Sequence, residues 1–213
     1  MTTLAIMKAR IANELGQRSD LDDEIANAIN DAIGAYQQTR FHFNEGRTVT
    51  FTTVAGQEFY DADDAANIAK LWVVDYMVYY VGDTPYHLGQ LTPAEMEGAS
   101  ANASNTGEPG AWCWYGDQIR IYPAPSGAYT VRVGGTMTIA APATDAEANN
   151  PWMTHAERLI RSRAKLELAI HVLKEQDTAA AMGEAVREAL QQLNDKTTKR
   201  TMVNQGRVRA MNF

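Results

Sequence analysis

The side chains that could act as nucleophiles or metal ligands are few in this 213-residue chain. Cys113 is the only cysteine, and it lies between Trp112 and Trp114 in a strand-like pattern, where a free cysteine usually packs as a small apolar group. A single thiol excludes an intrachain disulfide and a multi-thiolate metal site. The histidines fall in different predicted elements, so their spacing does not favour a metal centre. They are His42, His87, His155 and His171.

Paired carboxylates are the other groups with catalytic potential, because glycoside hydrolysis needs two of them at a set separation. Asp22 and Asp23 stand at a predicted helix start, where the helix dipole favours negative charge, and Asp63 and Asp64 stand in a predicted loop. The chain contains no phosphate-binding glycine loop, no HExxH motif and no nucleophile elbow. We therefore expect a protein that is not an enzyme, with no catalytic residue, no cofactor and no metal.

The aromatic cluster at residues 112–115 leaves an alternative function open. Strand alternation places Trp112 and Trp114 on one face and Tyr115 on the other. An exposed tryptophan pair would form a platform for stacking a sugar, whereas a buried pair would belong to the core. The alternative is thus a carbohydrate- or protein-binding β-sandwich module without enzymatic activity.

The charge of the chain is unevenly distributed. With 19 Lys and Arg against 26 Asp and Glu, the formal charge is −7, and 45% of the residues are hydrophobic. This composition is typical of a globular protein and argues against a free-standing nucleic-acid binder. Residues 1–157 hold 8 basic and 20 acidic side chains, a charge of −12, whereas residues 158–213 hold 11 and 6, a charge of +5. The two ends of the chain are therefore expected to meet different surroundings.

Four segments near the two ends of the chain show the apolar spacing of amphipathic helices. They are residues 4–15, about 20–40, 154–174 and about 178–200. The expected N-caps are Ser19 or Asp20, Thr154 in a capping box with Glu157, and Asp177 or Thr178. Each helix has one apolar face and needs a partner to bury it.

The segment between these helices is rich in aromatic and β-branched residues, and residues 41–129 hold 15 of the 18 aromatic side chains. Its alternation and turn formers predict six or seven short strands, at residues 47–53, 57–60, 68–81, 84–88, 112–115, 118–122 and 128–139. A capping box at Thr92 and Glu95 predicts a short helix to about Ala99. Strands at such regular spacing suggest a sandwich or a small barrel.

This order of elements predicts an α+β fold. We expect the N- and C-terminal helices to form a four-helix bundle, with an antiparallel β-sandwich or barrel domain inserted between the second and third helices. The expected domains are residues 1–44 with 152–200, which are helical, and residues 45–151, which are β-rich. Residues 201–213 lack periodicity and are expected to form an extended C-terminal tail.

The third predicted helix carries a basic face formed by Arg158, Arg161 and Lys165. One interpretation is an ordinary solvated charged face, in which Glu157 pairs with Arg161. The other is an interface with an acidic patch, namely the acidic N-terminal region of a neighbouring copy. In the second interpretation Asp22 and Asp23 join the basic residues at a subunit–subunit interface.

Several segments resemble the head-to-tail adaptor, or connector, proteins of tailed phages. The capped helix from Ser19 through residues 25–33 is followed by Tyr36, Gln37, Arg40, Phe41, Phe43, Asn44 and Glu45, which match the N-terminal region of that family. Residues 52–60 resemble its first hairpin. Residues 116–123 and the late helix with Glu157, Ile160, Arg161 and Ala164 are similar as well, so the resemblance covers nearly the whole chain.

The resemblance implies a structural protein of the virion, in its neck or tail. Such adaptors form a ring under the portal, which we expect to be a dodecamer, extend the DNA channel and offer a docking surface for tail, nozzle or fibre proteins. The helical domain is then the ring-forming one, and genomic DNA passes through without specific binding. The C-terminal tail is expected to reach the portal protein, with Arg200, Arg207, Arg209, Met211 and Phe213 as its binding residues.

Two further features concern location. The apolar stretch from Leu71 to Val81 is interrupted by Asp75 and is too short to cross a bilayer, so we expect no membrane association. The residues after Met1 lack the pattern of a signal peptide. We therefore expect a soluble protein that is synthesised in the host cytoplasm.

Overall fold

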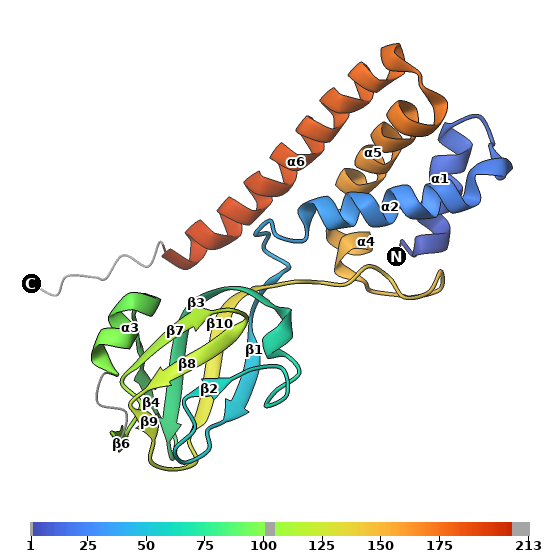
Figure 1. Cartoon of the computed structure of the whole chain (residues 1–213). Helices are drawn as coiled ribbons and strands as arrows, with labels where there is room; N and C mark the ends of the chain where they lie inside the picture. The colour runs from blue at the N-terminus through green and yellow to red at the C-terminus, as the bar shows by residue number, and fades with distance from the viewer. Residues whose placement is uncertain (1, 101–104, 206–213) are drawn as a thin grey trace, which may run out of the picture. The chain divides into compact units, whose positions relative to one another are not determined.

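The computed structural model describes residues 2–100 and 105–205, and it separates the chain into two compact units (Figure 1). The first, called here the helical unit, comprises the residues up to Phe43 and those from Ile139 onward. The second, the β unit, is the continuous segment Asn44–Thr138. Each unit has its own hydrophobic core. The chain is therefore a mixed α and β protein, as the sequence predicts.

The helical unit is built from both ends of the chain. Its elements are α1 (Leu4–Glu14), the 3-10 turn η1 (Ser19–Leu21), α2 (Asp22–Tyr36), α4 (Pro151–His155), α5 (Glu157–Glu167), the π-helical turn η3 (Leu168–Leu173) and α6 (Gln176–Gln205). The predicted first and second helices are present, and the second ends at Tyr36 rather than near residue 40. The predicted cap at Ser19 or Asp20 is wrong, because both residues lie in η1 and α2 begins after Leu21 without a side-chain cap.

Apolar side chains at helical spacing form the core of this unit. On α2 the buried stripe includes Ile25, Ile29 and Ile33, and on α1 it consists of Met7 and Ile11. These stripes share one cluster with buried residues of the later helices, which are Trp152, Met153, Ala156, Leu159, Ile160, Ala164, Leu168, Val186, Ala189 and Leu193. Burial of apolar area on every helix holds the two chain ends together.

The predicted β-rich domain extended to residue 151, whereas Ile139 and the residues after it belong to the helical unit. Trp152, fully buried, donates from Nε1 to the carbonyl oxygen of Ile139 at 2.9 Å, and Asn150 Nδ2 donates to that of Ala140 at 3.2 Å. The predicted capping box at Thr154 is wrong. Asn150 caps α4 by accepting from the N–H of Trp152, and the Thr154 hydroxyl lies inside that helix.

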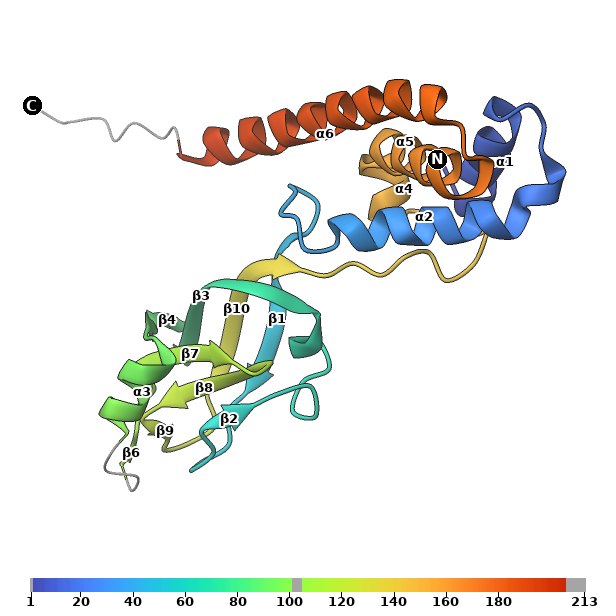
Figure 2. The same cartoon turned by 45° about the horizontal axis from the view of Figure 1, so that its top comes forward.

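The end of α5 and the long α6 also differ from a plain four-helix arrangement. After Glu167 the helix widens into one π-helical turn, and Lys174 then takes a left-handed conformation that ends it. Among the α6 residues whose burial is described, Val186, Ala189 and Leu193 are buried, and the helix itself continues to Gln205. In two views α6 runs past the ends of α2 and α5 (Figures 1 and 2).

The β unit contains two four-stranded sheets and one two-stranded sheet. The first sheet has the order β1-β10-β3-β4 and is antiparallel, and the second has the order β2-β8-β7-β5. The strands are β1 (Glu45–Thr52), β2 (Phe59–Tyr60), β3 (Leu71–Val81), β4 (Thr84–His87), β5 (Gly89–Gln90), β6 (Thr106–Gly107), β7 (Ala111–Tyr115), β8 (Gln118–Tyr122), β9 (Ala124–Pro125) and β10 (Thr130–Met137). Two helical segments join them, the 3-10 turn η2 (Ile68–Lys70) and α3 (Pro93–Ala99).

Two features of these sheets depart from the prediction. Within the described residues neither sheet closes on itself, so the predicted barrel is wrong. The short pairs β5–β7 and β6–β9 are parallel rather than antiparallel. Side chains of both four-stranded sheets share one core, which includes Val49, Met77, Trp112, Ile119 and Val133.

A pair of glycines lets β10 pass close to β3. Gly134 lies opposite Tyr76, and a Cβ there would come within 2.3 Å of the tyrosine ring. Gly135 is tighter, because a Cβ would lie 2.0 Å from the carbonyl oxygen of Val73. The register shifts between these two glycines, which marks a β-bulge that bends the ladder.

Candidate functional site

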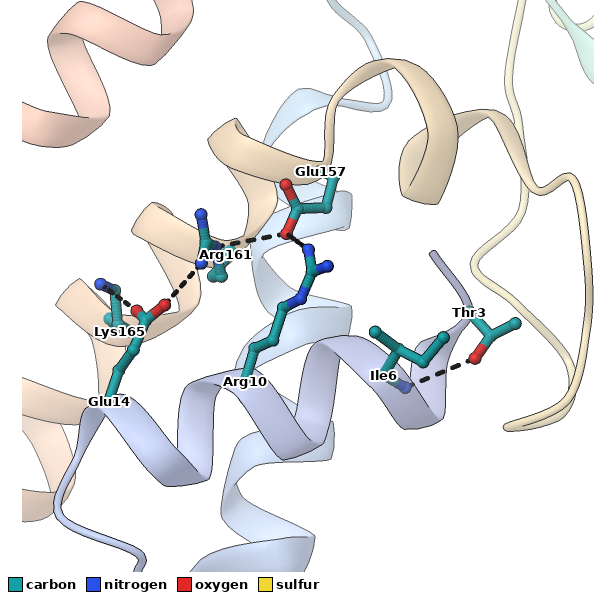
Figure 3. A network of polar contacts seen from close by, with 7 residues as sticks. All are labelled: Thr3, Ile6, Arg10, Glu14, Glu157, Arg161 and Lys165. Atoms are coloured by element: carbon teal, nitrogen blue, oxygen red, sulfur yellow. Dashed lines mark hydrogen bonds and ion pairs between the residues drawn. The ribbon is translucent and has the colours of Figure 1, made fainter. Parts of the chain in front are cut away.

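The basic residues predicted on one face of α5 pair with two different helices. Towards α1, Lys165 Nζ lies 2.6 Å from Glu14 Oε2, and Arg161 Nη1 lies 2.5 Å from Glu14 Oε1 (Figure 3). Arg161 Nε also lies 3.3 Å from Glu157 Oε1, which receives Arg10 Nη1 at 3.1 Å. Five charged side chains therefore join α1 to α5.

The spacing of these five residues explains how they meet. Arg10 and Glu14 are four residues apart on α1, and Glu157, Arg161 and Lys165 are four apart on α5. Residues four apart share one side of a helix, so two charged rows face each other where the helices pack. The predicted pair between Glu157 and Arg161 is present in this network.

Glu14 contacts both Arg161 and Lys165, and these contacts change the pKa of its carboxyl. Partial burial alone would raise the pKa of the Glu14 carboxyl. Hydrogen bonds and charge attraction from Lys165 and Arg161 outweigh burial, so the pKa lies below its ordinary value. The negative charge of Glu14 is therefore stabilised by the folded state.

Arg158 points to the other neighbouring helix. Its Nη2 lies 3.0 Å from Glu188 Oε2 on α6, and its Nη1 donates to Gln192 Oε1 at 2.9 Å. Both charged side chains are about half exposed, so this pair adds little stability. It nevertheless occupies the charge of Arg158 within its own chain.

The predicted acidic partners lie at the start of α2. Lys8 of α1 contacts Asp22 at 3.5 Å and Asp145 of the segment before α4 at 3.1 Å. The hydrogen bond to Asp145 is the largest influence on Lys8 and raises its pKa. Asp22 and Asp23 are both exposed. Within the described part of one copy, neither acid forms an ion pair with the basic face of α5.

Only one member of the predicted portal-binding set is described. Arg200 is exposed on α6. The other members, Arg207, Arg209, Met211 and Phe213, lie outside the described residues.

The two tryptophans of the alternative function do not form an exposed platform. Trp112 is 1% exposed in the β-unit core, and Trp114 packs against the same core. The predicted shared face is thus present, but it faces inward, because strand alternation turns both rings towards the opposite sheet. This burial contradicts the sugar-stacking interpretation. Cys113 is also buried, and burial raises the pKa of its thiol.

A second polar cluster, centred on Arg120, was not predicted. Arg120 donates to Glu58 at 3.1 Å, to Glu97 at 2.5 Å and to the hydroxyl of Ser100 at 2.8 Å, and its guanidinium lies 5.0 Å from the Phe59 ring centroid. These contacts fasten α3 to the second sheet. Two carboxylates already match the single charge, so the cluster is built for structure rather than for binding an anion. Local spacing offered no signal, because the partners lie 62 and 23 residues away.

The acidic loop at residues 61–64 serves local structure. Asp61 accepts from the N–H of Asp63, and Asp64 accepts from the N–H of Asp61 and from the Gln57 amide. Among residues 2–100 and 105–205, no three potential metal-ligating side chains gather into one group. The loop thus carries turn-forming carboxylates, which hold their own backbone.

The net charge resides in the β unit. Residues 44–138 contain 4 Lys and Arg and 11 Asp and Glu, a formal charge of −7. The remaining residues contain 15 of each sign. The acidic character of the chain is thus a property of one unit, and the helical unit is balanced.

Comparison with known protein families identifies the family of this chain. A family model described as SU10 adaptor protein matches residues 2–210. No curated protein matches the chain. In the part of the chain that the structure describes, no helix has the length and apolar character needed to cross a membrane.

Proposed function

Because the chain belongs to the SU10 adaptor protein family, we propose that it is a phage head-to-tail adaptor that assembles into a ring under the portal. The match over residues 2–210 carries the proposal, since it spans both units. The family is one of structural adaptors of phages rather than of enzymes. Its place is accordingly the neck of the virion.

The ring is proposed to be a dodecamer formed through the helical unit. This unit is assembled from both chain ends around one hydrophobic core, so each copy can present the same packed surface to its neighbours. The charges of Arg158, Arg161 and Lys165 are matched inside the chain, so we assign these residues to holding α1, α5 and α6 in place. Asp22 and Asp23 remain our candidates for the face that meets a neighbouring copy, since both are exposed even though Asp22 also contacts Lys8.

The ring is proposed to extend the channel through which genomic DNA passes without specific binding. Tight binding of the phosphate backbone requires an excess of basic side chains. Neither unit has such an excess, since the β unit carries −7 and the helical unit is balanced. A channel surface without excess positive charge lets DNA slide through and does not hold it.

The two remaining partners are proposed to meet different parts of the chain. The portal protein is proposed to receive the C-terminal tail from Arg200 to Phe213, with Arg207, Arg209 and Met211 as further contacts. Tail, nozzle or fibre proteins are proposed to dock on the adaptor ring, to which the β unit offers an acidic surface.

The test is to mix the purified chain with the portal protein of the same phage and to image the mixture by electron microscopy. The expected result is a ring of twelve copies on the portal, and a chain that ends at Arg200 should bind the portal at least tenfold more weakly. A chain that stays monomeric both alone and with the portal would contradict the proposal.

A further inference from the structure

The helical unit has an open groove between α2 and the π-helical turn η3. Ala28 of α2 and Leu168 and Val172 of η3 supply its apolar surface, and its volume is about 270 Å³. Glu24 and Asp31 stand along the α2 side, seven residues apart. At a rise of about 1.5 Å per residue, these two carboxylates are spaced by about 10 Å along the helix.

The carboxylates of the groove differ in whether they are already paired. Glu167, on the opposite wall, pairs with Arg163 and lies 3.2 Å from His171 Nε2. Glu24 and Asp31 are exposed, and no ion pair joins them to the described part of the chain. The α2 wall of the groove therefore presents two negative charges next to an apolar floor.

The complementary surface lies on α6. Among the α6 residues whose burial is described, Leu193 is the last buried one, and the helix continues through the exposed Lys196 and Lys199. Residues 194–200 carry only polar and charged side chains, and within the chain the Thr197 hydroxyl oxygen accepts a hydrogen bond from the N–H of His42 at 3.2 Å. Lys196 and Lys199 are nevertheless exposed, so their charges can face an acidic partner. This end of α6 has positive charges where the groove has negative ones.

These two surfaces cannot meet within one copy. The helix α6 starts shortly after η3, which forms the groove, and Lys199 lies 23 residues beyond that start. At about 1.5 Å per residue, Lys199 is about 35 Å from the start of α6. In both views the helix is straight enough that its C-terminal end lies far from the end of α5 (Figures 1 and 2).

We propose that the groove between α2 and η3 receives the C-terminal end of α6 from a second copy of this chain, with Lys196 and Lys199 facing Glu24 and Asp31. Such a contact joins two different surfaces and is head-to-tail, which closes into a ring when the rotation between copies is right. The inference rests on the proposed ring and names the surfaces that build it. Arg200 and the residues after it stay available for the portal.

Charge reversal tests the contact. The variant E24K/D31K has a basic groove and a basic helix end, and the variant K196E/K199E has an acidic groove and an acidic helix end. Each alone should form rings at least tenfold less than the wild type, by mass photometry with and without portal. A mixture of the two should regain rings, because each groove then meets a helix end of opposite charge in alternating order.

The matched control is the pair E184K and R187E, which reverses exposed charges elsewhere on α6. Both control variants should form rings like the wild type. If E24K/D31K or K196E/K199E forms rings as readily as the wild type, the groove contact is overturned and the proposed ring is left intact. Two variants that fail alone and also fail when mixed would overturn it as well. A wild-type chain that forms no ring even on the portal would overturn the ring and the groove together.

Discussion

Glu14 at the end of α1 accepts a hydrogen bond from Lys165 on α5 at 2.6 Å, although the two residues are 151 positions apart. Arg161 reaches the other oxygen of the same carboxylate. The contact therefore ties the N-terminal helix α1 to α5, the second helix after the β unit. Within one copy, both cations thus have an acidic partner.

The Glu14 pair predicts a loss of stability in acid. The pKa of Glu14 is lowered in the folded state, so its contribution is fully present above the unfolded pKa of about 4.3 and is lost as the pH falls through the folded pKa. The variant Glu14→Gln should have a free energy of unfolding about 1 kcal/mol below that of the wild type at pH 7, and nearly the same as the wild type at pH 3. Urea unfolding measures both values. Glu184→Gln, in an exposed pair, is the control and should change stability by a few tenths at most. Equal losses for Glu14→Gln at both pH values would contradict the assignment.

The bulge of β10 predicts a graded effect of alanine. Gly135→Ala should destabilise the β unit by about 3 kcal/mol, because its Cβ would overlap the backbone carbonyl of Val73. Gly134→Ala should cost about half as much, since the clashing Tyr76 ring is partly exposed and can move aside. Thermal unfolding measures both.

Gly98 provides the control for these two variants. It lies in α3 with nothing within 4 Å of a Cβ, so Gly98→Ala should stabilise by about 0.5 kcal/mol through helix propensity. A similar loss at Gly98 and Gly135 would mean that the close approach of β10 to β3 is not the cause.

The cap of α4 predicts a contrast between two neighbouring polar residues. Asn150→Ala should cost about 1–2 kcal/mol, because it removes the cap on the N–H of Trp152 and the bond to the Ala140 carbonyl. Thr154→Ala should cost about 0.5 kcal/mol, since its hydroxyl donates only to the Asn150 carbonyl four residues earlier. Chemical denaturation compares the two. If Thr154→Ala were the more damaging, the capping box expected from the sequence would hold after all.

The burial of the Cys113 thiol predicts that it reacts slowly with thiol reagents in the folded protein. Cys113 is 3% exposed and burial raises its pKa, so at pH 7–8 it should react with a thiol reagent at least roughly tenfold more slowly in the folded protein than in urea. The variant Tyr115→Cys adds a thiol at a site that is 73% exposed, and it should label rapidly with one equivalent. Rapid labelling of the wild type would contradict the burial of β7.

Local patterns were sufficient for much of the fold. The apolar spacing of residues 25–33 predicted α2, since a helix repeats every 3.6 residues whatever its surroundings. Thr92 and Glu95 form the capping box that their spacing predicted, because both bonds lie within one turn. Residue type and spacing alone also argue against thiolate and histidine metal sites, since the chain has one cysteine and its histidines are scattered.

Contacts between distant segments were decided only by the tertiary structure. The sequence showed that Arg161 and Lys165 share a charged helix face, but it did not show that Glu14 is their partner. The residues on one face of a helix do not reveal which other helix packs against that face. Asn150 displaced Thr154 as a cap because the preceding segment packs on the helical core. The sequence by itself therefore determined the helical and strand-rich segments and the capping box of α3, through interactions over a few residues. Folding in three dimensions decided which charges are matched inside the chain and which, such as Glu24 and Lys199, remain on its surface.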